Sequence, residues 1–405
     1  LLSALVFAKH YDRIDLLEKR TEKEVQDATA ARSLQLVLSE RGWTALRKVG
    51  LEQAVRSIAT PVVGRVDGTT SEFQPYDVSG RSIGAVSRKL LQEILEGAVA
   101  RLPHVHVHLG TEVVGVDAAL RVAYSKSGAS HAFTPWDFDL LIGADGVRSG
   151  IASALHAEGG EEFKKSSRVY RELHLTSWPF QSDAFQYFSD GEVLVGGFPS
   201  RDGGGGMFVM HRPELAQDLF DVNASNSLFA RFPSLEGALG REALGELKRT
   251  KPGAMGSKQC AHWTAEGSVV LAGDSAHAIL PFMGQGLNTG LEDVLVLAEC
   301  LESMSQHEAL ENYVAVRRPE AEAICALSDR HAKRLFGEMS PFELAWEDSI
   351  SGALLEFGFP STYASCAFTL EAFSEIIQRE EAVLERSKAT SKLRDIVLPA
   401  RVLAA

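Results

Sequence analysis

The amino-acid sequence predicts an α/β fold with an inserted antiparallel sheet and a helical C-terminal region. Three observations lead to this fold class. Helical and strand-like segments alternate from residue 1 to residue 146, and the strands end in acidic or glycine-rich turns. Strand-like runs separated by turn residues fill 173–210, which is typical of an antiparallel sheet. From Asp293 onward, apolar residues recur at helical spacing.

The first part of the chain supplies the expected α/β elements in turn. Leu1, Leu2, Leu5 and Val6 share one helical stripe, and residues 13–18 form a strand-like run that ends in an acid. The remaining elements predicted here are a helix over 39–51 that stops at Gly50, an amphipathic helix over 86–102, and strands over 105–109, 112–116 and 138–142.

The antiparallel sheet is expected as an insertion in the α/β part. A helical stretch follows it, and a return strand over 268–272 leads back into the α/β part. The predicted strands of the insertion are 173–178, 184–188, 192–196 and 207–210.

The composition indicates a globular protein without a nucleic-acid or metal partner. With 405 residues, 45% of them hydrophobic, the chain can bury a large core. Its net charge of -13 and its lack of any long Lys/Arg run argue against nucleic acid. The four cysteines lie far apart with no CxxC, so neither a zinc site nor a disulfide framework is expected. No apolar run approaches the roughly 20 residues of a membrane-spanning helix, and a cytoplasmic location is expected.

The order of helix, strand and terminal acid over residues 1–18 matches the second half of a dinucleotide-binding unit. In that unit the acid holds ribose hydroxyls, and a GxGxxG turn before the helix holds the pyrophosphate. Here that turn, and the strand before it, would lie upstream of Leu1. The alternative for Glu18 is a solvated surface acid.

A second dense motif follows the return strand. Residues 273–293, GDSAHAILPFMGQGLNTGLED, place an acid directly after the strand, then a proline, several glycines and a helix start. Such glycines let the backbone approach a ligand closely, and the free N–H groups of a helix start favour an anion. The alternative is a strand-to-helix turn made only for packing.

These motifs resemble those of the single-component FAD-dependent aromatic hydroxylases. The match to the family rests on residues 86–88, Val-Ser-Arg, on residues 143–146, Gly-Ala-Asp-Gly, and on the Gly-Asp pair at 273–274. The resemblance extends over most of the chain. The segments most similar to the kynurenine 3-monooxygenase branch of this family are 32–42, 45–52 and 273–288.

The resemblance implies a division of the chain into three parts. They are an FAD-binding Rossmann-like domain of the GR2 type, N-terminally incomplete, a substrate domain built on the inserted antiparallel sheet, and a C-terminal helical segment. The FAD-binding domain would comprise 1–62, 82–162 and 258–335, the substrate domain 63–81 and 163–257, and the helical segment 336–405.

The resemblance also implies the chemistry. FAD is the expected cofactor, with NADPH and O2 as co-substrates, and a flavin hydroperoxide would hydroxylate the ring of an aromatic carboxylate or a kynurenine-like amino acid. Because the cofactor carries the reaction, no residue is expected to act as a catalytic acid, base or nucleophile. His277 is interpreted as a satisfied buried histidine.

The family's cofactor contacts map onto positions spread along the chain. Asp274 would accept hydrogen bonds from the ribityl hydroxyls, and the helix that starts near Leu287 would face the pyrimidine edge of the flavin. The cofactor-binding residues implied by the resemblance are Glu18, Arg20, Val37, Arg88, Val113, Asp145, Asp274, Pro281, Gly286, Leu287 and Asn288.

The substrate positions follow the family in part. Arg65 and Tyr76 match the pair that anchors the carboxylate of kynurenine. His331 and Phe368 stand where the family has an Asn and a late Tyr, so kynurenine is expected to be a poorer substrate than a less polar aromatic carboxylate. Ala152 stands where the family often has an Arg, which puts the nicotinamide pyrophosphate contact in doubt.

Two hypotheses remain open from the sequence. The first is an active aromatic monooxygenase, and the second is a non-catalytic, FAD-poor or truncated relative that keeps the fold. Without the glycine turn the chain is expected to hold FAD weakly, which a flavin spectrum would reveal. Eukaryotic members carry a C-terminal membrane anchor, so a mitochondrial surface is implied by resemblance only, and residues 395–405 are too short to span a bilayer.

Overall fold

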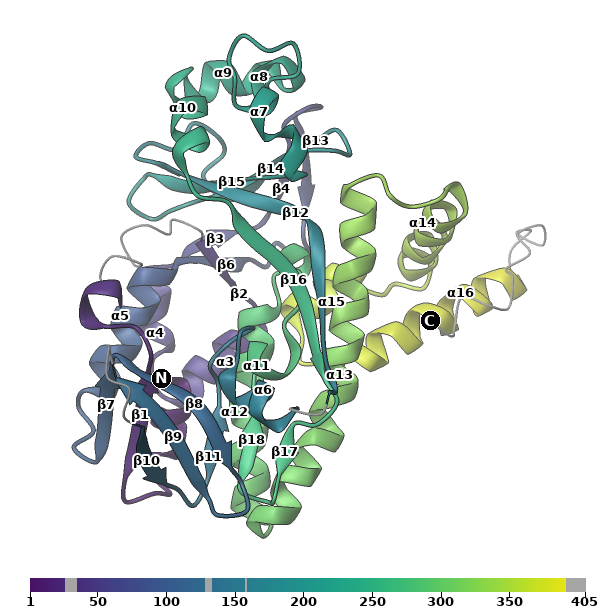
Figure 1. The fold of residues 1–405 in the computed structure, drawn as a ribbon. Coiled ribbons are helices and arrows are strands. Elements are labelled where there is room, and N and C mark those ends of the chain that lie inside the picture. The colour runs from purple at the N-terminus through teal and green to yellow at the C-terminus, as the bar shows by residue number, and fades with distance from the viewer. Residues whose placement is uncertain (26–34, 128–132, 157–158, 391–405) are drawn as a thin grey trace.

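The computed structural model describes residues 1–25, 35–127, 133–156 and 159–390. Residues 32–34 of the family-like segment 32–42, and the terminal stretch 391–405, lie outside the described residues. Figure 1 shows an upper sheet capped by small helices, a lower α/β part, and a helical region at its side. The predicted fold class is therefore confirmed.

The lower part is built on two short parallel pairs of strands. β1 (Ile14–Glu18) pairs with β7 (Val105–Leu109). β11 (Leu141–Gly143) pairs with β18 (Val269–Leu271), and β17 (Thr264–Ala265) adds to β18 in the antiparallel sense. Two small antiparallel sheets complete this part: β8 (Thr111–Asp117), β9 (Val122–Ser127) and β10 (Thr134–Asp137), and β2 (Gln35–Leu38), β6 (Ile83–Ser87) and β3 (Thr60–Val62).

The main hydrophobic core lies between these strands and the helices packed on them. The three residues of β18 are fully buried, as are Leu38 and Leu46. A strand buried on both faces needs apolar residues at every position, which explains the run Val-Val-Leu in β18. The helices that cover this core are α1 (Leu2–Phe7), α3 (Glu40–Lys48), α4 (Glu52–Arg56), α5 (Arg88–Val99), α6 (Gly150–Leu155), α12 (Gly286–Ser303) and part of α13 (Gln306–Leu335).

The upper sheet has seven strands, and α7–α10 pack on it. Neighbouring strands within this sheet are antiparallel, except for the pair β13 and β4, which is parallel. A second core of alternating strand residues, such as Val195, Met207 and Val209, lies between this sheet and the helices. In sheet order the strands are β16 (Gly253–Cys260), β12 (Glu161–Leu175), β15 (Gly205–His211), β14 (Leu194–Pro199), β13 (Ala184–Ser189), β4 (Gly64–Asp67) and β5 (Glu72–Pro75). The helices are α7 (Ala216–Leu219), α8 (Leu228–Arg231), α9 (Pro233–Leu239) and α10 (Glu242–Arg249), preceded by the 3-10 turn η1 (Pro213–Leu215).

Strands β12 and β16 form a two-stranded ribbon that connects the upper sheet with the lower part (Figure 1). The pairing runs from Tyr170 opposite Gly253 to Glu161 opposite Cys260. The register shifts between Lys165 and Val169, which marks a β-bulge.

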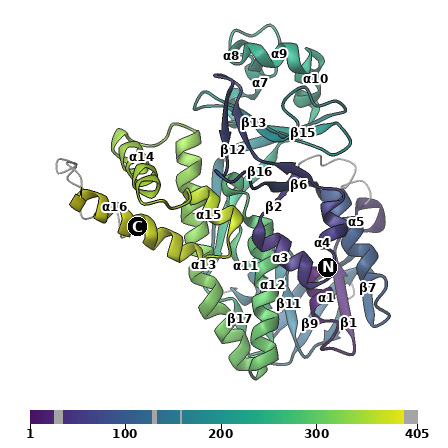
Figure 2. The same ribbon diagram turned by 180° about the vertical axis from the view of Figure 1, so that it is seen from behind.

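The C-terminal helices pack beside α13, and one of them also contacts α3 (Figure 2). They are α14 (Pro341–Glu356), α15 (Thr362–Phe368) and α16 (Phe373–Thr390). Arg41 of α3 ties them to the lower part, because its buried guanidinium donates to the carbonyls of Cys366, Thr369 and Glu371 and lies 3.9 Å from the ring centroid of Phe373. The same guanidinium pairs with Glu292 of α12 at 3.1 Å.

Several predicted elements have different bounds in the structure. Residues 86 and 87 end β6 instead of opening a helix, and α5 begins at Arg88. Residues 138–140 lie before β11, which is only three residues long. The strand predicted over 192–196 is β14, Leu194–Pro199, and the strand predicted from residue 173 begins at Glu161. The segments of β4, β5 and β16 were not predicted as strands, although residues 63–81 were expected to belong to the domain built on this sheet.

Candidate active site

A glycine turn presents Asp274 at the end of β18. Gly273 has φ +62° and ψ -143°, a conformation that side-chain-bearing residues rarely adopt. Asp274 then begins the short helix α11 (Asp274–His277), and no hydrogen-bond or ion-pair partner holds its carboxylate within the described ranges. Its side chain is open to solvent, yet surrounding protein and the charge of Asp293 raise its pKa. Asp274 is thus an exposed acceptor without a protein partner among the residues that the structure describes.

Arg88 lies close enough to Asp274 for its charge to act on that carboxylate. It is the first residue of α5, its side chain is exposed, and its positive charge opposes the rise in the pKa of Asp274. The two residues are 186 positions apart in the sequence, so the fold brings them together.

The second feature is the start of helix α12, which follows the 3-10 turn η2 (Pro281–Met283). Gly284 has φ +65°, and a Cβ atom there would lie 3.4 Å from a methyl carbon of Val37. In the described part of the chain, the backbone N–H groups of Gly286, Leu287 and Asn288 have no hydrogen-bond partner. Together with the helix dipole, these donors make the start of α12 a site for negative charge.

The side chain of Asn288 is fully used by the protein. Its amide nitrogen donates to the carbonyls of Val37 at 2.9 Å and Gly284 at 2.8 Å, and its oxygen accepts from the N–H of Ser39 at 2.9 Å. Asn288 is also completely buried. It therefore fixes β2 and the glycine turn against α12, and only its backbone N–H remains for a cofactor.

Glu18 and Arg20 form a bidentate ion pair at the end of β1. The guanidinium donates from Nε and Nη2 to the two carboxylate oxygens, each at 2.9 Å. Burial acts to raise the pKa of Glu18, but the hydrogen bonds from Arg20 hold it below its ordinary value. A ribose hydroxyl that donates to Glu18 would have to use the lone pairs of the carboxylate oxygens that Arg20 does not occupy.

Asp145 and Val113 lie beside the short helix α6. The Asp145 carboxylate accepts from the N–H of Gly150 at 2.8 Å and, more weakly, of Ile151 at 3.4 Å. Val113, in β8, is close to the same helix, because a Cβ atom on Gly150 would lie 2.9 Å from the Val113 carbonyl oxygen. Ala152 is fully buried in α6, where the side chain of an arginine would not fit without displacing the core.

The predicted substrate residues meet beside the upper sheet. Arg65 of β4 donates to Gln74 at 2.9 Å, and its guanidinium lies 5.6 Å from the ring centroid of Tyr187. No carboxylate pairs with Arg65 among the residues that the structure describes. Its charge acts on Tyr76 and His331, which come from β5's end and from α13. The fold thus gathers Tyr76 and His331 around the guanidinium of Arg65.

Tyr363 is a further residue of this candidate site, and sequence reasoning missed it. It lies on α15, and its ring packs against that of Tyr76 with centroids 4.7 Å apart. Burial raises the pKa of both phenols, while Arg65 acts to lower it. Both hydroxyls are therefore protonated at neutral pH. The signal was available in the sequence, since a tyrosine lies five residues before Phe368, but no pairing rule connects residue 363 with residue 76.

His331 and Phe368 complete this group in different ways. Burial, followed by the charges of nearby arginines including Arg65, lowers the pKa of His331 to about 4, so its imidazole is neutral at pH 7. Phe368 shares an apolar cluster with Tyr76 and Tyr363. Its ring also faces Arg81 at 4.9 Å, and its carbonyl accepts from the same guanidinium.

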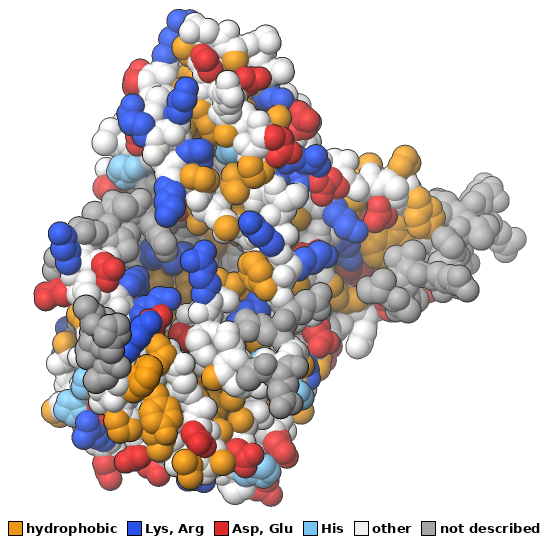
Figure 3. All heavy atoms as spheres, viewed as in Figure 1, with side chains coloured by type: hydrophobic (Ala, Val, Ile, Leu, Met, Phe, Trp, Pro, Cys, Tyr) orange, Lys and Arg blue, Asp and Glu red, His pale blue; other side chains and the backbone are white. Residues whose placement is uncertain are grey.

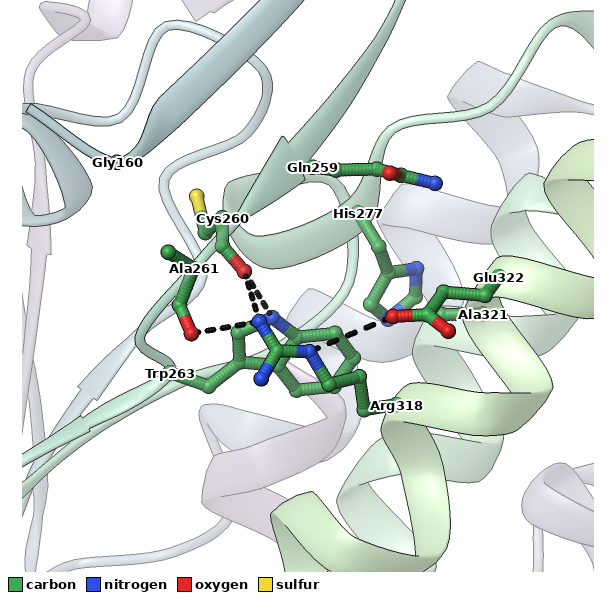
Figure 4. Close-up of a pocket in the computed structure, with 9 residues that line it drawn as sticks. All are labelled: Gly160, Gln259, Cys260, Ala261, Trp263, His277, Arg318, Ala321 and Glu322. Atoms are coloured by element: carbon green, nitrogen blue, oxygen red, sulfur yellow. Dashed lines mark hydrogen bonds and ion pairs between the residues drawn. The ribbon is translucent and has the colours of Figure 1, made fainter. Parts of the chain in front are cut away.

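A separate cavity of about 360 Å³ adjoins His277 (Figure 4). Trp263, Cys260 and Arg318 line it, and Arg318 donates to the carbonyls of Cys260 and Ala261. None of the predicted cofactor or substrate residues lines this cavity.

Figure 3 shows Lys and Arg side chains gathered across the middle of the molecule, between the upper sheet and the lower part. Over the described ranges, no helix has the length and apolar character to cross a membrane, and no cluster of three potential metal ligands occurs.

Comparisons with known proteins match most of the chain. The family described as FAD binding domain matches residues 13–328. The kynurenine 3-monooxygenase of Christiangramia forsetii is 28% identical over 366 residues, which cover 84% of this chain and 78% of the relative. That of Salinispora arenicola is 29% identical over 420 residues, which cover 96% and 90%.

Two solved structures show the same fold. 2-Methyl-3-hydroxypyridine-5-carboxylic acid oxygenase has a TM-score of 0.69 at 20% identity, covering 84% of this chain and 90% of its own. Pseudomonas aeruginosa PqsL, in complex with 2-aminobenzoylacetate, has a TM-score of 0.65 at 19% identity, covering 83% and 93%.

Proposed function

Since this chain belongs to the FAD binding domain family, as a flavoprotein monooxygenase, we propose that it uses NADPH and O2 to hydroxylate an aromatic carboxylate or a kynurenine-like amino acid. The observation that carries the substrate class is Arg65. It is a cation without a carboxylate partner among the described residues, and three tyrosines and a neutral histidine surround it.

The residues present fit FAD. Asp274 offers a carboxylate acceptor to hydroxyl groups, and the start of α12 offers three free N–H groups to negative charge. Gly284 has a left-handed φ of +65°, which favours glycine at this turn between Val37 and the helix. An acceptor and a set of donors at the ends of neighbouring elements match the ribityl chain and the pyrimidine edge of a flavin.

The chain's own groups would position the reactants and stabilise charge. When bound, FAD supplies the electron transfer and the oxygen activation. The N–H groups and dipole of α12 would stabilise negative charge on the edge of the ring system facing them, because such donors are already oriented. Asp274 would hold the cofactor in register through its ribityl hydroxyls.

Arg65 would anchor the substrate carboxylate and so place the ring. A guanidinium–carboxylate pair in a partly apolar site is strong and directional. Tyr76 and Tyr363 remain protonated and can donate to the same carboxylate. The neutral His331 adds a hydrogen-bonding group without adding charge. Phe368 and its apolar neighbours would keep water away from the ring.

The placement of these residues supports the proposed division of the chain. Arg65 and Tyr76, from 63–81, belong to the upper sheet that 163–257 builds, so both segments would form the substrate domain. His331 and Tyr363 reach the same place from the helices. The substrate would therefore lie between the upper sheet and the C-terminal helices, with the cofactor held by the lower part.

The test is coupled hydroxylation by the purified, FAD-loaded protein. Kynurenine, 2-aminobenzoylacetate and their methyl esters are compared for their stimulation of NADPH oxidation. The masses of the products formed under isotopically labelled O2 are measured by mass spectrometry. The free acids are expected to gain one oxygen atom from O2, and the esters to react far more slowly because Arg65 loses its partner. Equal rates for acids and esters would rule out a carboxylate anchor. An FAD-loaded protein that hydroxylates none of these compounds would contradict the proposed substrate class.

A further inference from the structure

Asp293, on α12, is a buried carboxylate that holds both ends of the segment 273–277. One oxygen accepts from the backbone N–H of Gly273 at 2.8 Å and lies 2.6 Å from Nε2 of His277. The other oxygen accepts from Nε of Arg317 at 2.8 Å. Asp293 has no exposed surface, so it cannot contact a cofactor itself.

The backbone of this segment also touches α12 directly. A Cβ atom on Gly290 would lie 3.3 Å from the Cα of Gly273, so the helix and the turn meet without side chains between them. Gly290 lies one turn before Asp293 on the helix. The turn that presents Asp274 is thus held against α12 by close packing at Gly290 and by hydrogen bonds at Asp293.

Asp293 is itself fixed from the neighbouring helix. Arg317 of α13 bridges it to Glu292, which lies 2.8 Å from Nη1 of Arg317 and 3.1 Å from Nε of Arg41. The charges of His277 and Arg317 hold the pKa of Asp293 well below its usual range against the effect of burial. Asp293 therefore stays ionised, and its bonds to the turn are charge-assisted.

His277 is fixed on its other side by an aromatic ring. The indole of Trp263 stacks on the imidazole with centroids 5.0 Å apart, and both rings border the cavity of Figure 4. With Nε2 bound to Asp293, the imidazole cannot swing away from α12. The segment 273–277 is consequently held at both ends by Asp293, and its last residue is also held by the ring of Trp263.

From this geometry we infer that Asp293 is the positioning residue of the segment 273–277, and that it sets the affinity and electronic environment of FAD through the placement of Asp274. The inference rests on the proposed function only in taking Asp274 as a cofactor contact. Asp293 also carries a charge next to Asp274, so its removal would change both the geometry and the field at the ribityl position.

The test compares Asp293→Asn with Glu292→Gln in the full chain. Each variant removes one buried or half-buried negative charge that pairs with Arg317, but only Asp293 contacts the segment 273–277. FAD dissociation constants are measured on the apoprotein by flavin fluorescence, together with the visible spectrum, the flavin reduction potential and the melting temperature. For Asp293→Asn the dissociation constant is expected to rise about tenfold to a hundredfold, the equivalent of one lost charge-assisted hydrogen bond. The spectrum and potential shift with it, and Glu292→Gln changes neither.

Equal weakening in both variants would show that Asp293 acts only through general stability, and unchanged affinity in Asp293→Asn would overturn the inference outright. Should Asp293→Asn fail to fold, Gly290→Ala decides, since it pushes the turn from the helix without altering any charge. Weaker FAD binding by folded Gly290→Ala supports control through this contact, and wild-type affinity contradicts it. All of these measurements omit the aromatic substrate, so a failure of the proposed hydroxylation would leave them unaffected.

Discussion

At the scale of single residues, the most informative side chain is Arg65, because the protein supplies no carboxylate for it within the described ranges. Arg65→Ala is expected to raise KM for an aromatic carboxylate about tenfold to a hundredfold, since a charge-assisted hydrogen bond contributes about 1.5–3 kcal/mol. FAD absorbance should stay unchanged. Gln74→Ala is the matched control, because it removes the neutral partner of Arg65 and keeps the charge. An unchanged KM in Arg65→Ala would show that the guanidinium is not the anchor.

His331 makes a prediction about acid stability. Its pKa falls from 6.5 to about 4 on folding, so between these values the unfolded chain binds more protons than the folded one. This contribution to stability is complete above the unfolded value and is lost as the pH falls through the window. His331→Gln should remove at most about 3 kcal/mol of that pH dependence. Urea unfolding at about pH 7.5 and pH 4.5 measures it, with His307→Gln at the exposed start of the same helix as control.

At the scale of elements, Arg41 joins α3 to the turn between α15 and α16. Arg41→Ala would remove one of the two arginines that pair with Glu292 and would leave three backbone carbonyls without this donor. We expect a loss of about 3–5 kcal/mol in the free energy of unfolding. Arg47→Ala, on the exposed side of the same helix, should cost less than about 1 kcal/mol. Urea denaturation of the two variants gives the comparison. A similar small effect for both would mean that the C-terminal helices are held by their apolar contacts alone.

The elements also show where sequence patterns stop being informative. The segment 83–87 is buried at almost every position, so it has neither the period of a strand nor that of a helix, and its last two residues were assigned to the following helix. Strand β16 contains Gly, Ser, Lys and Gln and was missed for the opposite reason, since too few of its residues are apolar. Its partner β12 supplies the pairing that fixes it. Long-range pairing of this kind leaves no trace in a local window.

At the scale of the whole molecule, the four cysteines report on global unfolding. None of them forms a disulfide, all are at most 6% exposed, and burial raises the pKa of Cys325 to about 11 and of Cys366 to about 12. A thiol reagent at mild pH is expected to label none of them in the native protein and all of them after denaturation. Rapid labelling of one cysteine in the native state would identify a part of the molecule that opens locally.

The site as a whole was predictable where one motif carries it and unpredictable where distant segments meet. The turn after β18 and the start of α12 follow from the spacing of an acid, a proline and glycines over residues 273–288. The ring contact of Tyr363 with Tyr76 joins residues 287 positions apart. The hydrogen bonds of Asn288 with Val37 and Ser39 join residues 251 and 249 positions apart. Motifs predict which chemical groups are present, and only the tertiary fold decides which of them remain available.

The ribbon of β12 and β16 has a mechanical consequence for the molecule. Two strands that are hydrogen-bonded to each other resist bending more than a single connecting segment does, so this ribbon is a stiff connection between the upper sheet and the lower part. The ribbon is expected to bend most easily between residues 165 and 169, where the register shifts and the ladder of hydrogen bonds is interrupted. Any rocking of the upper sheet over the lower part would pivot there. Backbone amides at the pivot should therefore exchange with deuterium sooner than those in the ladders on either side of it.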